Sequence, residues 1–204
     1  MNKIYFKHGT MFSGKSLNLI STVKTYEHNG YNVLILKPSK DTRDKQVIKS
    51  RMSNEVLECV TFTDKDDLYI LVTRLINDKM TKYDVIFIDE VQFCSEKHIE
   101  QLHYVSKYAP IICYGLKTSY TGDIFPSIAK LIPLAEDIQE IKTVCAMCNK
   151  KATHNLLLRN NVPVYEGDQV NIEGEDIQEQ YKAVCRMHFY GPRIAEEEQL
   201  DIKW

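Results

Sequence analysis

The segment 9–16 constrains the fold of this chain more than any other part of the sequence. It reads Gly-Thr-Met-Phe-Ser-Gly-Lys-Ser, which has all four fixed positions of the phosphate-binding pattern GxxxxGK(S/T). An apolar run, 4–6, precedes the segment, and apolar residues at helical spacing follow it. In a strand–loop–helix unit of this kind, backbone N–H groups surround phosphate oxygens. The sequence therefore predicts a binding site for a nucleoside triphosphate.

The loop positions carry separate expectations. We expect the ammonium of Lys15 to reach the β- and γ-phosphates and the hydroxyl of Ser16 to ligate magnesium. The pattern does not distinguish a kinase from an ATPase, a GTPase or a helicase. The ATP-binding residues expected in the loop are Gly9, Thr10, Met11, Phe12, Ser13, Gly14, Lys15 and Ser16.

Length and charge narrow the class of protein. The 204 residues, 44% of them hydrophobic, suffice for one domain or for one domain with a small appendage. The 26 basic and 28 acidic residues give a net charge of -2, which argues against a protein that coats nucleic acid. No apolar run is long enough for a membrane span, and the N-terminus lacks a signal-peptide pattern. We therefore expect a cytoplasmic protein whose partners include neither a membrane nor a nucleic acid.

Short apolar runs alternate with helical patterns over the first 140 or so residues. Strands are expected at 33–36, 85–88 and 110–114, and helices from the loop to about 27, at 66–80 and at 95–107. The polar stretch 40–54 has the character of a long loop or lid. Four-residue apolar strands separated by helices indicate an α/β fold, a P-loop (RecA-like) parallel sheet with helices on both faces. We assign it to residues 1–142.

The strand at 85–88 ends in two acids, Asp89 and Glu90. An acid at this point lies at the sheet edge where α/β folds bind ligands, so Asp89 is expected to hold magnesium. Glu90 would then be close enough to the γ-phosphate to take a proton from the attacking oxygen. The continuation to Gln92 also matches helicase motors, in which this glutamine senses the γ-phosphate. The attacking group can thus be a substrate hydroxyl in a kinase or water in a helicase-type ATPase.

Two pairs of metal-binding residues lie near the C-terminus, Cys145–Cys148 and Cys185–His188, each with two residues between its members. Four such ligands match one tetrahedral structural Zn²⁺. The residues between the pairs are mostly polar, and we expect no core of their own from them. Zinc would therefore close them into a lasso, a small zinc-binding domain at 143–192 followed by a tail at 193–204.

Together these motifs resemble one family, the short, zinc-containing thymidine kinases, in its bacterial-type branch. The resemblance covers about residues 4 to 190. It rests on both metal-binding pairs, on Tyr181, and on the segments 9–16, 40–43, 87–93, 115–116 and 131–136.

The resemblance implies transfer of the ATP γ-phosphoryl group to the 5′-hydroxyl of thymidine, or of deoxyuridine, in pyrimidine salvage. It makes Glu90 the catalytic base, with Mg²⁺ bound to ATP by Ser16 and Asp89 and with Gln92 in the ATP site. Tyr120 and Tyr181 would sandwich the base. The family also implies a homotetramer inhibited by dTTP. The substrate-binding positions that it implies are Met11, Asp41, Arg43, Leu116, Tyr120, Val170, Asn171, Ile172, Glu173, Gly174 and Tyr181.

Four positions depart from the family pattern, and all of them bear on base recognition. Lys117 stands where an acid is usual and Tyr120 where phenylalanine is usual. Asn155 takes the place of a common threonine, and Glu173 that of the first glycine of a pair.

Overall fold

The computed structural model describes residues 1–40, 46–50, 53–168 and 179–197, which divide into two compact units. The first, here the sheet unit, comprises Met1–His8, Gly14–Leu116 and Pro126–Glu140. The second, here the cysteine unit, comprises Gly9–Ser13, Lys117–Phe125 and Ile141–Trp204. Both units are discontinuous in sequence, and the domain boundaries at 142 and 192 stay a prediction.

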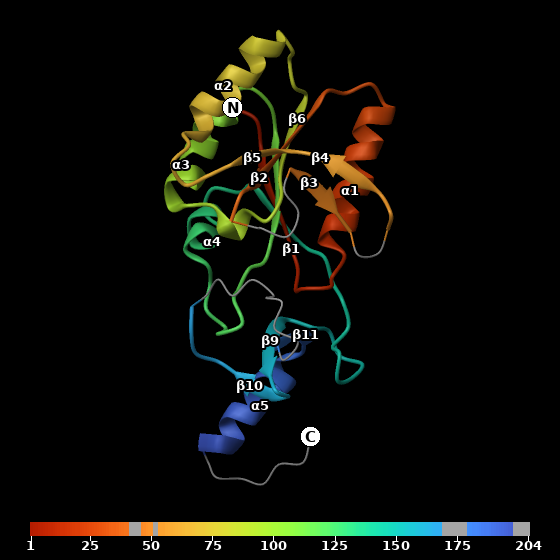
Figure 1. Cartoon of the computed structure of the whole chain (residues 1–204), viewed down its shortest axis with the longest axis vertical. Helices are drawn as coiled ribbons and strands as arrows, with labels where there is room; N and C mark the ends of the chain where they lie inside the picture. The colour runs from red at the N-terminus through yellow and green to blue at the C-terminus, as the bar shows by residue number, and fades with distance from the viewer. Residues whose placement is uncertain (41–45, 51–52, 169–178, 198–204) are drawn as a thin grey trace. The chain divides into compact units, whose positions relative to one another are not determined.

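The sheet unit is built on six parallel strands in the order β5-β2-β6-β7-β1-β8. Figure 1 shows α1 on one side of the sheet and α2, α3 and α4 on the other. The prediction of a parallel sheet with helices on both faces is therefore confirmed. The strands are β1 (Ile4–His8), β2 (Val33–Pro38), β5 (Val60–Phe62), β6 (Val85–Ile88), β7 (Ile111–Gly115) and β8 (Asp137–Glu140). The helices are α1 (Lys15–His28), α2 (Leu68–Lys79), α3 (Glu96–Val105) and α4 (Pro126–Leu131), with a 3₁₀ turn, η1, at Val91–Phe93.

Side-chain caps determine where α2 and α3 begin. The carboxylate of Asp67 accepts a hydrogen bond from the backbone N–H of Ile70, 3.0 Å away, at the start of α2. At the start of α3, the Ser95 hydroxyl accepts from the His98 N–H, and the Ser95 N–H donates to His98 Nδ1. These bonds satisfy N–H groups that the helix itself leaves unpaired. The predicted cap at Ser95 is confirmed.

The predicted loop at 40–54 is wrong in part. Its described residues include β3 (Val47–Lys49), which pairs antiparallel with β4 (Val56–Glu58). Ile48 and Leu57 face each other across this pair, and both are buried. Each strand carries only one buried apolar residue, which is too short a pattern to register as alternation.

The cysteine unit contains an antiparallel sheet in the order β10-β9-β11 and the helix α5. Its elements are β9 (His154–Arg159), β10 (Val162–Val164), β11 (Glu179–Val184) and α5 (Arg186–Glu197). Leu156 and Leu158 pack with Cys145, Val184, Cys185 and Phe189 in one buried cluster. The expectation that the residues between the metal-binding pairs lack a core is therefore wrong. Both faces of β9 are covered, so its three leucines read as a continuous run without the alternation of a half-buried strand.

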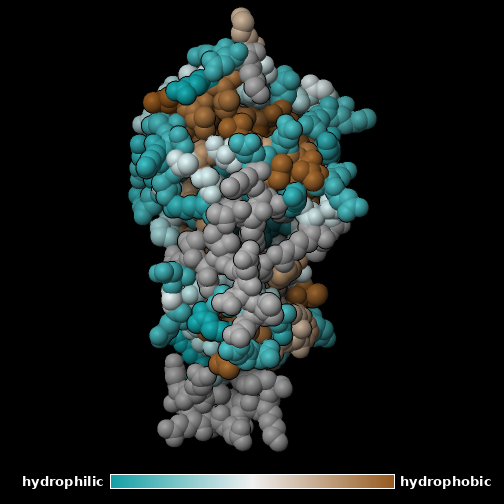
Figure 2. Space-filling view, in the orientation of Figure 1, coloured by the Kyte–Doolittle hydropathy of each residue, from teal (hydrophilic) through white to brown (hydrophobic). Residues whose placement is uncertain are grey.

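Polar side chains cover most of the described surface on the face shown in Figure 2, and apolar side chains appear there in separate patches. Within the described residues, no helix combines the length and the apolar character that crossing a membrane requires.

The Gln101 side chain links α3 to the beginning of α2 by hydrogen bonds. Replacing this side chain tests how much these bonds stabilise the fold. Its Oε1 accepts from the Leu68 N–H at 2.8 Å, and its Nε2 donates to Asp67 Oδ2 at 2.6 Å. Gln101→Met leaves a buried N–H unpaired, so we expect the free energy of unfolding to fall by about 1–3 kcal/mol. Urea denaturation measures this change, with the exposed Gln180→Met as the control. An unchanged midpoint would show that these bonds contribute nothing.

Candidate functional site

The first half of the predicted phosphate loop, Gly9–Ser13, belongs to the cysteine unit. A Cβ atom on Gly9 would collide with the Ser13 side chain and lie 2.6 Å from the Ile141 carbonyl oxygen, so the position requires glycine. The Ser13 N–H closes a turn onto the Thr10 carbonyl at 3.3 Å. Among the described residues, the buried Ser13 hydroxyl oxygen finds no hydrogen-bond partner. An unmatched buried hydroxyl fits a loop that binds a polar ligand.

The second half of the loop starts α1 in the sheet unit. Gly14 occupies the N-cap in a left-handed conformation, with φ 84°, and no side chain caps the helix. No acid lies in the first turn, while Lys15 is buried and Ser16 is half-buried. A helix N-terminus with an uncapped first turn and a buried ammonium group favours an anion.

Asp89 follows the fully buried strand β6 and is 4% exposed. Its N–H donates to the Leu36 carbonyl of β2 at 3.0 Å. Burial, reinforced by the neighbouring carboxylate of Glu90, raises the pKa of Asp89 to about 7. The cations of Lys37 and Lys15 act in the opposite direction. A carboxylate oxygen here and the Ser16 hydroxyl are hard oxygen donors of the kind that Mg²⁺ prefers.

Glu90 lies in the left-handed region, with φ 49° and ψ 42°, which is uncommon for a residue with a side chain. Such strain persists where surrounding contacts impose it, and it is frequent at functional sites. The side-chain amide of Gln92 donates to Glu90 Oε2 at 2.5 Å. The Leu116 N–H in turn donates to Gln92 Oε1 at 3.0 Å. The structure thus brings three predicted site residues into one hydrogen-bonded chain.

The cysteine unit gathers three predicted substrate residues into a second cluster. The predicted residues Tyr120 and Tyr181 are buried together with Leu157. Met11, the third predicted residue, packs against them, as does Val164. The two tyrosine rings meet edge to face, with centroids 6.3 Å apart and planes at 69°. A base sandwiched between the two tyrosines would stack on each ring, and each stacked pair needs a centroid separation of at least about 4.5 Å. The two tyrosine rings would therefore have to lie farther apart than they do here.

Asn155, named from the sequence only as a departure from the family pattern that bears on base recognition, has a structural role that the sequence did not predict. It is 3% exposed on β9, and its Oδ1 accepts from the Met11 N–H at 2.7 Å. Its Nδ2 donates to the Thr118 carbonyl at 3.2 Å. One loop amide is therefore bonded to protein, although the sequence predicted loop amides directed at phosphate. Besides the departure from the family pattern, the sequence signal was an asparagine beside three leucines, which indicates a buried, hydrogen-bonded amide.

The four predicted metal ligands come together in the cysteine unit, with all ligand atoms within 4.8 Å of one another. His188 Nδ1 lies 3.4 Å from Cys145 Sγ and 3.3 Å from Cys185 Sγ, and the sulfurs of Cys148 and Cys185 are 3.8 Å apart. A tetrahedral zinc with ordinary bond lengths separates two sulfurs by about 3.8 Å and sulfur from nitrogen by about 3.6 Å. The donor set and its spacing therefore fit a metal site.

The electrostatics of this cluster also suit a metal. Burial alone would raise the pKa of the Cys145 thiol, but hydrogen bonds from the Met147 and Cys185 backbone and contact with His188 outweigh it and lower the pKa to about 6. The thiolate is the form that ligates metals. The Met147 N–H lies 3.4 Å from Cys145 Sγ.

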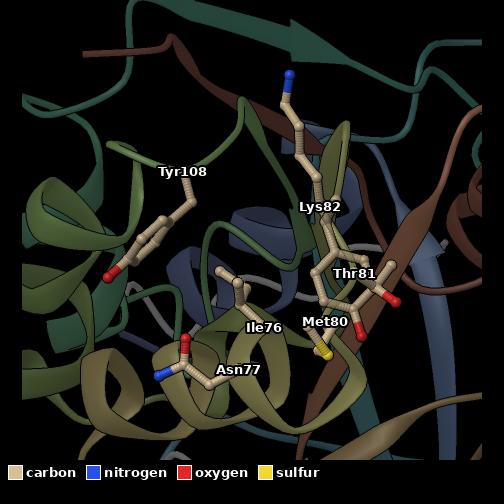
Figure 3. A pocket seen from close by; sticks show the side chains of 7 residues that line it. Ile76, Asn77, Met80, Thr81, Lys82 and Tyr108 are labelled. Atoms are coloured by element: carbon tan, nitrogen blue, oxygen red, sulfur yellow. The ribbon is translucent and has the colours of Figure 1, made fainter.

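Some predicted site residues lie outside the described part of the chain. These are Asp41 and Arg43, together with Val170, Asn171, Ile172, Glu173 and Gly174. A groove of about 470 Å³ at the end of α2, shown in Figure 3, shares no residue with the predicted site. Its lining residues are Ile76, Asn77, Met80, Thr81, Lys82, Tyr83 and Tyr108.

Comparison with known proteins gives one consistent family. The profile of the family described as "Thymidine kinase" matches residues 2–189. A thymidine kinase of Streptococcus agalactiae serotype Ia is 37% identical over 196 residues, which are 95% of this chain and 100% of that protein. A thymidine kinase of Streptococcus pyogenes serotype M3 is 36% identical over the same shares of the two chains.

Among solved structures, one of Pif1 helicases, described as unwinding forked double-stranded DNA, is 16% identical, with a TM-score of 0.36 over 69% of this chain and 39% of that chain. A likeness this slight carries no functional conclusion. The family profile, in contrast, spans nearly the whole chain, and full-length relatives share more than a third of its residues. The chain therefore belongs to the thymidine kinase family.

Proposed function

We propose that this protein transfers the γ-phosphoryl group of ATP to the 5′-hydroxyl of thymidine, with deoxyuridine as a second acceptor. The products are the nucleoside 5′-monophosphate and ADP, a salvage reaction for pyrimidines. The observation that carries this proposal is the arrangement of charged residues at one edge of the sheet in the sheet unit. There the buried Lys15 at the start of α1 and the Asp89–Glu90 pair after β6 act on one another electrostatically.

The phosphoryl step needs charge neutralisation and a base, and this sheet edge supplies both. Lys15 and the α1 N-terminus offset negative charge on the transferring group. Glu90 accepts the 5′-hydroxyl proton as the new O–P bond forms and the bond to the β-phosphate oxygen breaks. Gly9 to Ser16 form the ATP loop, and Gln92 lies in the same site. Ser16 and Asp89 would hold Mg²⁺, which would neutralise negative charge on the phosphate groups.

The nucleoside is assigned chiefly to the cysteine unit. Tyr120 and Tyr181 stack on the base after their rings separate, and each stacking contact is worth about 1–3 kcal/mol at comparable sites. Met11 and Leu116 surround the thymine methyl group. The family likeness adds Asp41, Arg43 and the backbone of Val170–Gly174 to the nucleoside contacts. Asn155 fixes the Met11 backbone from behind, which the 2.7 Å bond supports.

We extend the proposal to cofactors and assembly on the basis of family membership. One structural Zn²⁺ is bound by Cys145, Cys148, Cys185 and His188. The active form is a homotetramer in the cytoplasm, where free cysteines stay reduced. The end product dTTP inhibits the enzyme, and neither a membrane nor a nucleic acid takes part.

A direct test of the reaction uses the natural deoxynucleosides one at a time with ATP and Mg²⁺. We expect thymidine monophosphate as the main product and a slower reaction with deoxyuridine. The analogue 5′-deoxythymidine should bind without being phosphorylated, because it lacks the acceptor hydroxyl. ATP hydrolysis that is equally fast without any nucleoside would identify water as the acceptor and favour the helicase-type ATPase.

Glu90→Gln tests the proton acceptor. The amide keeps the size of the side chain but cannot take a proton, and loss of a general base typically lowers kcat by about 10²–10⁴-fold. We expect ATP and thymidine to bind within a few-fold of wild type by calorimetry. A large loss of ATP affinity with kcat preserved would instead place Glu90 in the metal site.

Cys148→Ser tests the metal cluster. Removing one of four ligands should release the metal, because a structural site holds it through all four. We expect about one zinc per chain in wild type and almost none in the variant, measured by elemental analysis, together with a lower melting temperature. Cys59→Ser, which changes a cysteine outside the cluster, should keep its zinc. Wild-type protein purified without zinc would contradict the assignment.

A further inference from the structure

Both ends of the Gln92 amide are bonded within the sheet unit. Its Oε1 accepts from the Leu116 N–H at 3.0 Å, and its Nε2 donates to Glu90 Oε2 at 2.5 Å. The two bonds specify one orientation of the amide, because a backbone N–H requires the carbonyl end and a carboxylate requires the NH₂ end. The side chain is 4% exposed, so water does not compete freely for either bond.

The backbone around Gln92 is fixed as firmly as its side chain. The Ser127 hydroxyl, 1% exposed, donates to the Gln92 carbonyl at 2.9 Å. A Cβ atom on Gly115 would lie 2.5 Å from Gln92 Oε1 and 2.9 Å from Val91 Cγ1, so a side chain there would push the amide out of its present position. The end of β7, with Leu116 directly after it, and α4 thus both hold this one residue of η1.

Glu90 depends on that arrangement. Its backbone lies in a sparsely populated conformation, and it directly precedes η1, which contains Gln92. A bond at Oε2 leaves the lone pairs of Oε1 to receive a proton. The same bond restrains rotation of the carboxylate.

We propose that Gln92 is a positioning residue that holds the Glu90 carboxylate in the orientation in which it receives the 5′-hydroxyl proton. This inference rests on the proposed function. It differs from the role that the matching glutamine has in helicase motors, where it senses the γ-phosphate, because both ends of the Gln92 amide already bind protein groups. Gln92 acts through Glu90 and has no reactive role of its own.

The experiment compares two glutamines that make the same kinds of bond. Gln92 and Gln101 each accept from a backbone N–H and donate to a carboxylate. Gln92→Met should lower kcat by about 10- to 100-fold, the cost of a misplaced catalytic group, while the KM values and the ATP Kd change by less than about threefold. Gln101→Met should lose similar stability and keep kcat. Gln92→Glu, which keeps an acceptor for the Leu116 N–H but lacks the NH₂ donor, should also lose kcat.

The double variant that combines Gln92→Met with Glu90→Gln tests whether Gln92 acts only by positioning Glu90. If Gln92 acts through Glu90, adding Gln92→Met to Glu90→Gln should slow turnover no further. Multiplied losses would overturn the inference, as would a selective rise in the ATP Kd or a kcat of Gln92→Met within threefold of wild type. Should Gln92→Met not fold, Ser127→Ala releases the same backbone and is judged by the same cycle. A wild-type protein that makes no nucleoside monophosphate would refute the proposed function instead.

Discussion

A buried carboxylate at the end of a buried strand is the constraint on which the sheet unit depends. An isolated ionised carboxylate is costly to bury, and Asp89 is 4% exposed. Its neighbours offset part of that cost, because β2 pairs with β6 in the register Leu36↔Ile88 and so brings Lys37 beside Asp89. Lys15 at the start of α1 supplies a second cation. A parallel sheet delivers strand ends and a helix N-terminus to one edge, so this fold brings the buried carboxylate and the two cations together.

The sequence was sufficient for features with a local signal. The phosphate loop, the strand before Asp89, the Ser95 cap and the paired metal ligands all depend on residues within a few positions of one another. The antiparallel pair β3–β4 was not predicted, because each strand has one buried residue and therefore shows no alternation of apolar and polar residues. The core of the cysteine unit was not predicted, because β9 is covered on both faces and its sequence therefore lacks the alternation of a half-buried strand.

Hydrogen bonds between a single side chain and a distant backbone group could not be predicted from the sequence. Met11 meets Asn155 across 144 positions, and Leu116 meets Gln92 across 24. No periodicity encodes such pairs. Their partners are single amides whose alternative hydrogen bonds are equally good until the backbone is folded. The orientation of the Tyr120 and Tyr181 rings is unpredictable for the same reason.

Strand β9 connects the two halves of the cysteine unit. Leu156 and Leu158 face the cluster that contains Cys145 and Cys185, while Leu157 faces the cluster of Tyr120 and Tyr181. Because successive side chains point to opposite faces, any shift of this strand moves both clusters at once. Order at the metal ligands and order at the aromatic rings are therefore linked through one six-residue strand.

The closeness of the cysteine ligands has a consequence for the protein when it holds no metal. The sulfurs of Cys148 and Cys185 are 3.8 Å apart, and a disulfide bond needs only a modest approach from there to about 2.05 Å. A disulfide there would remove two of the four donors, because neither sulfur would remain a thiolate that can ligate a metal. An oxidant that reaches the metal-free protein can therefore cross-link or cap the ligands before a metal binds. Reduction of that bond would then have to precede metal binding, so uptake of a metal would depend on the redox state of the surroundings.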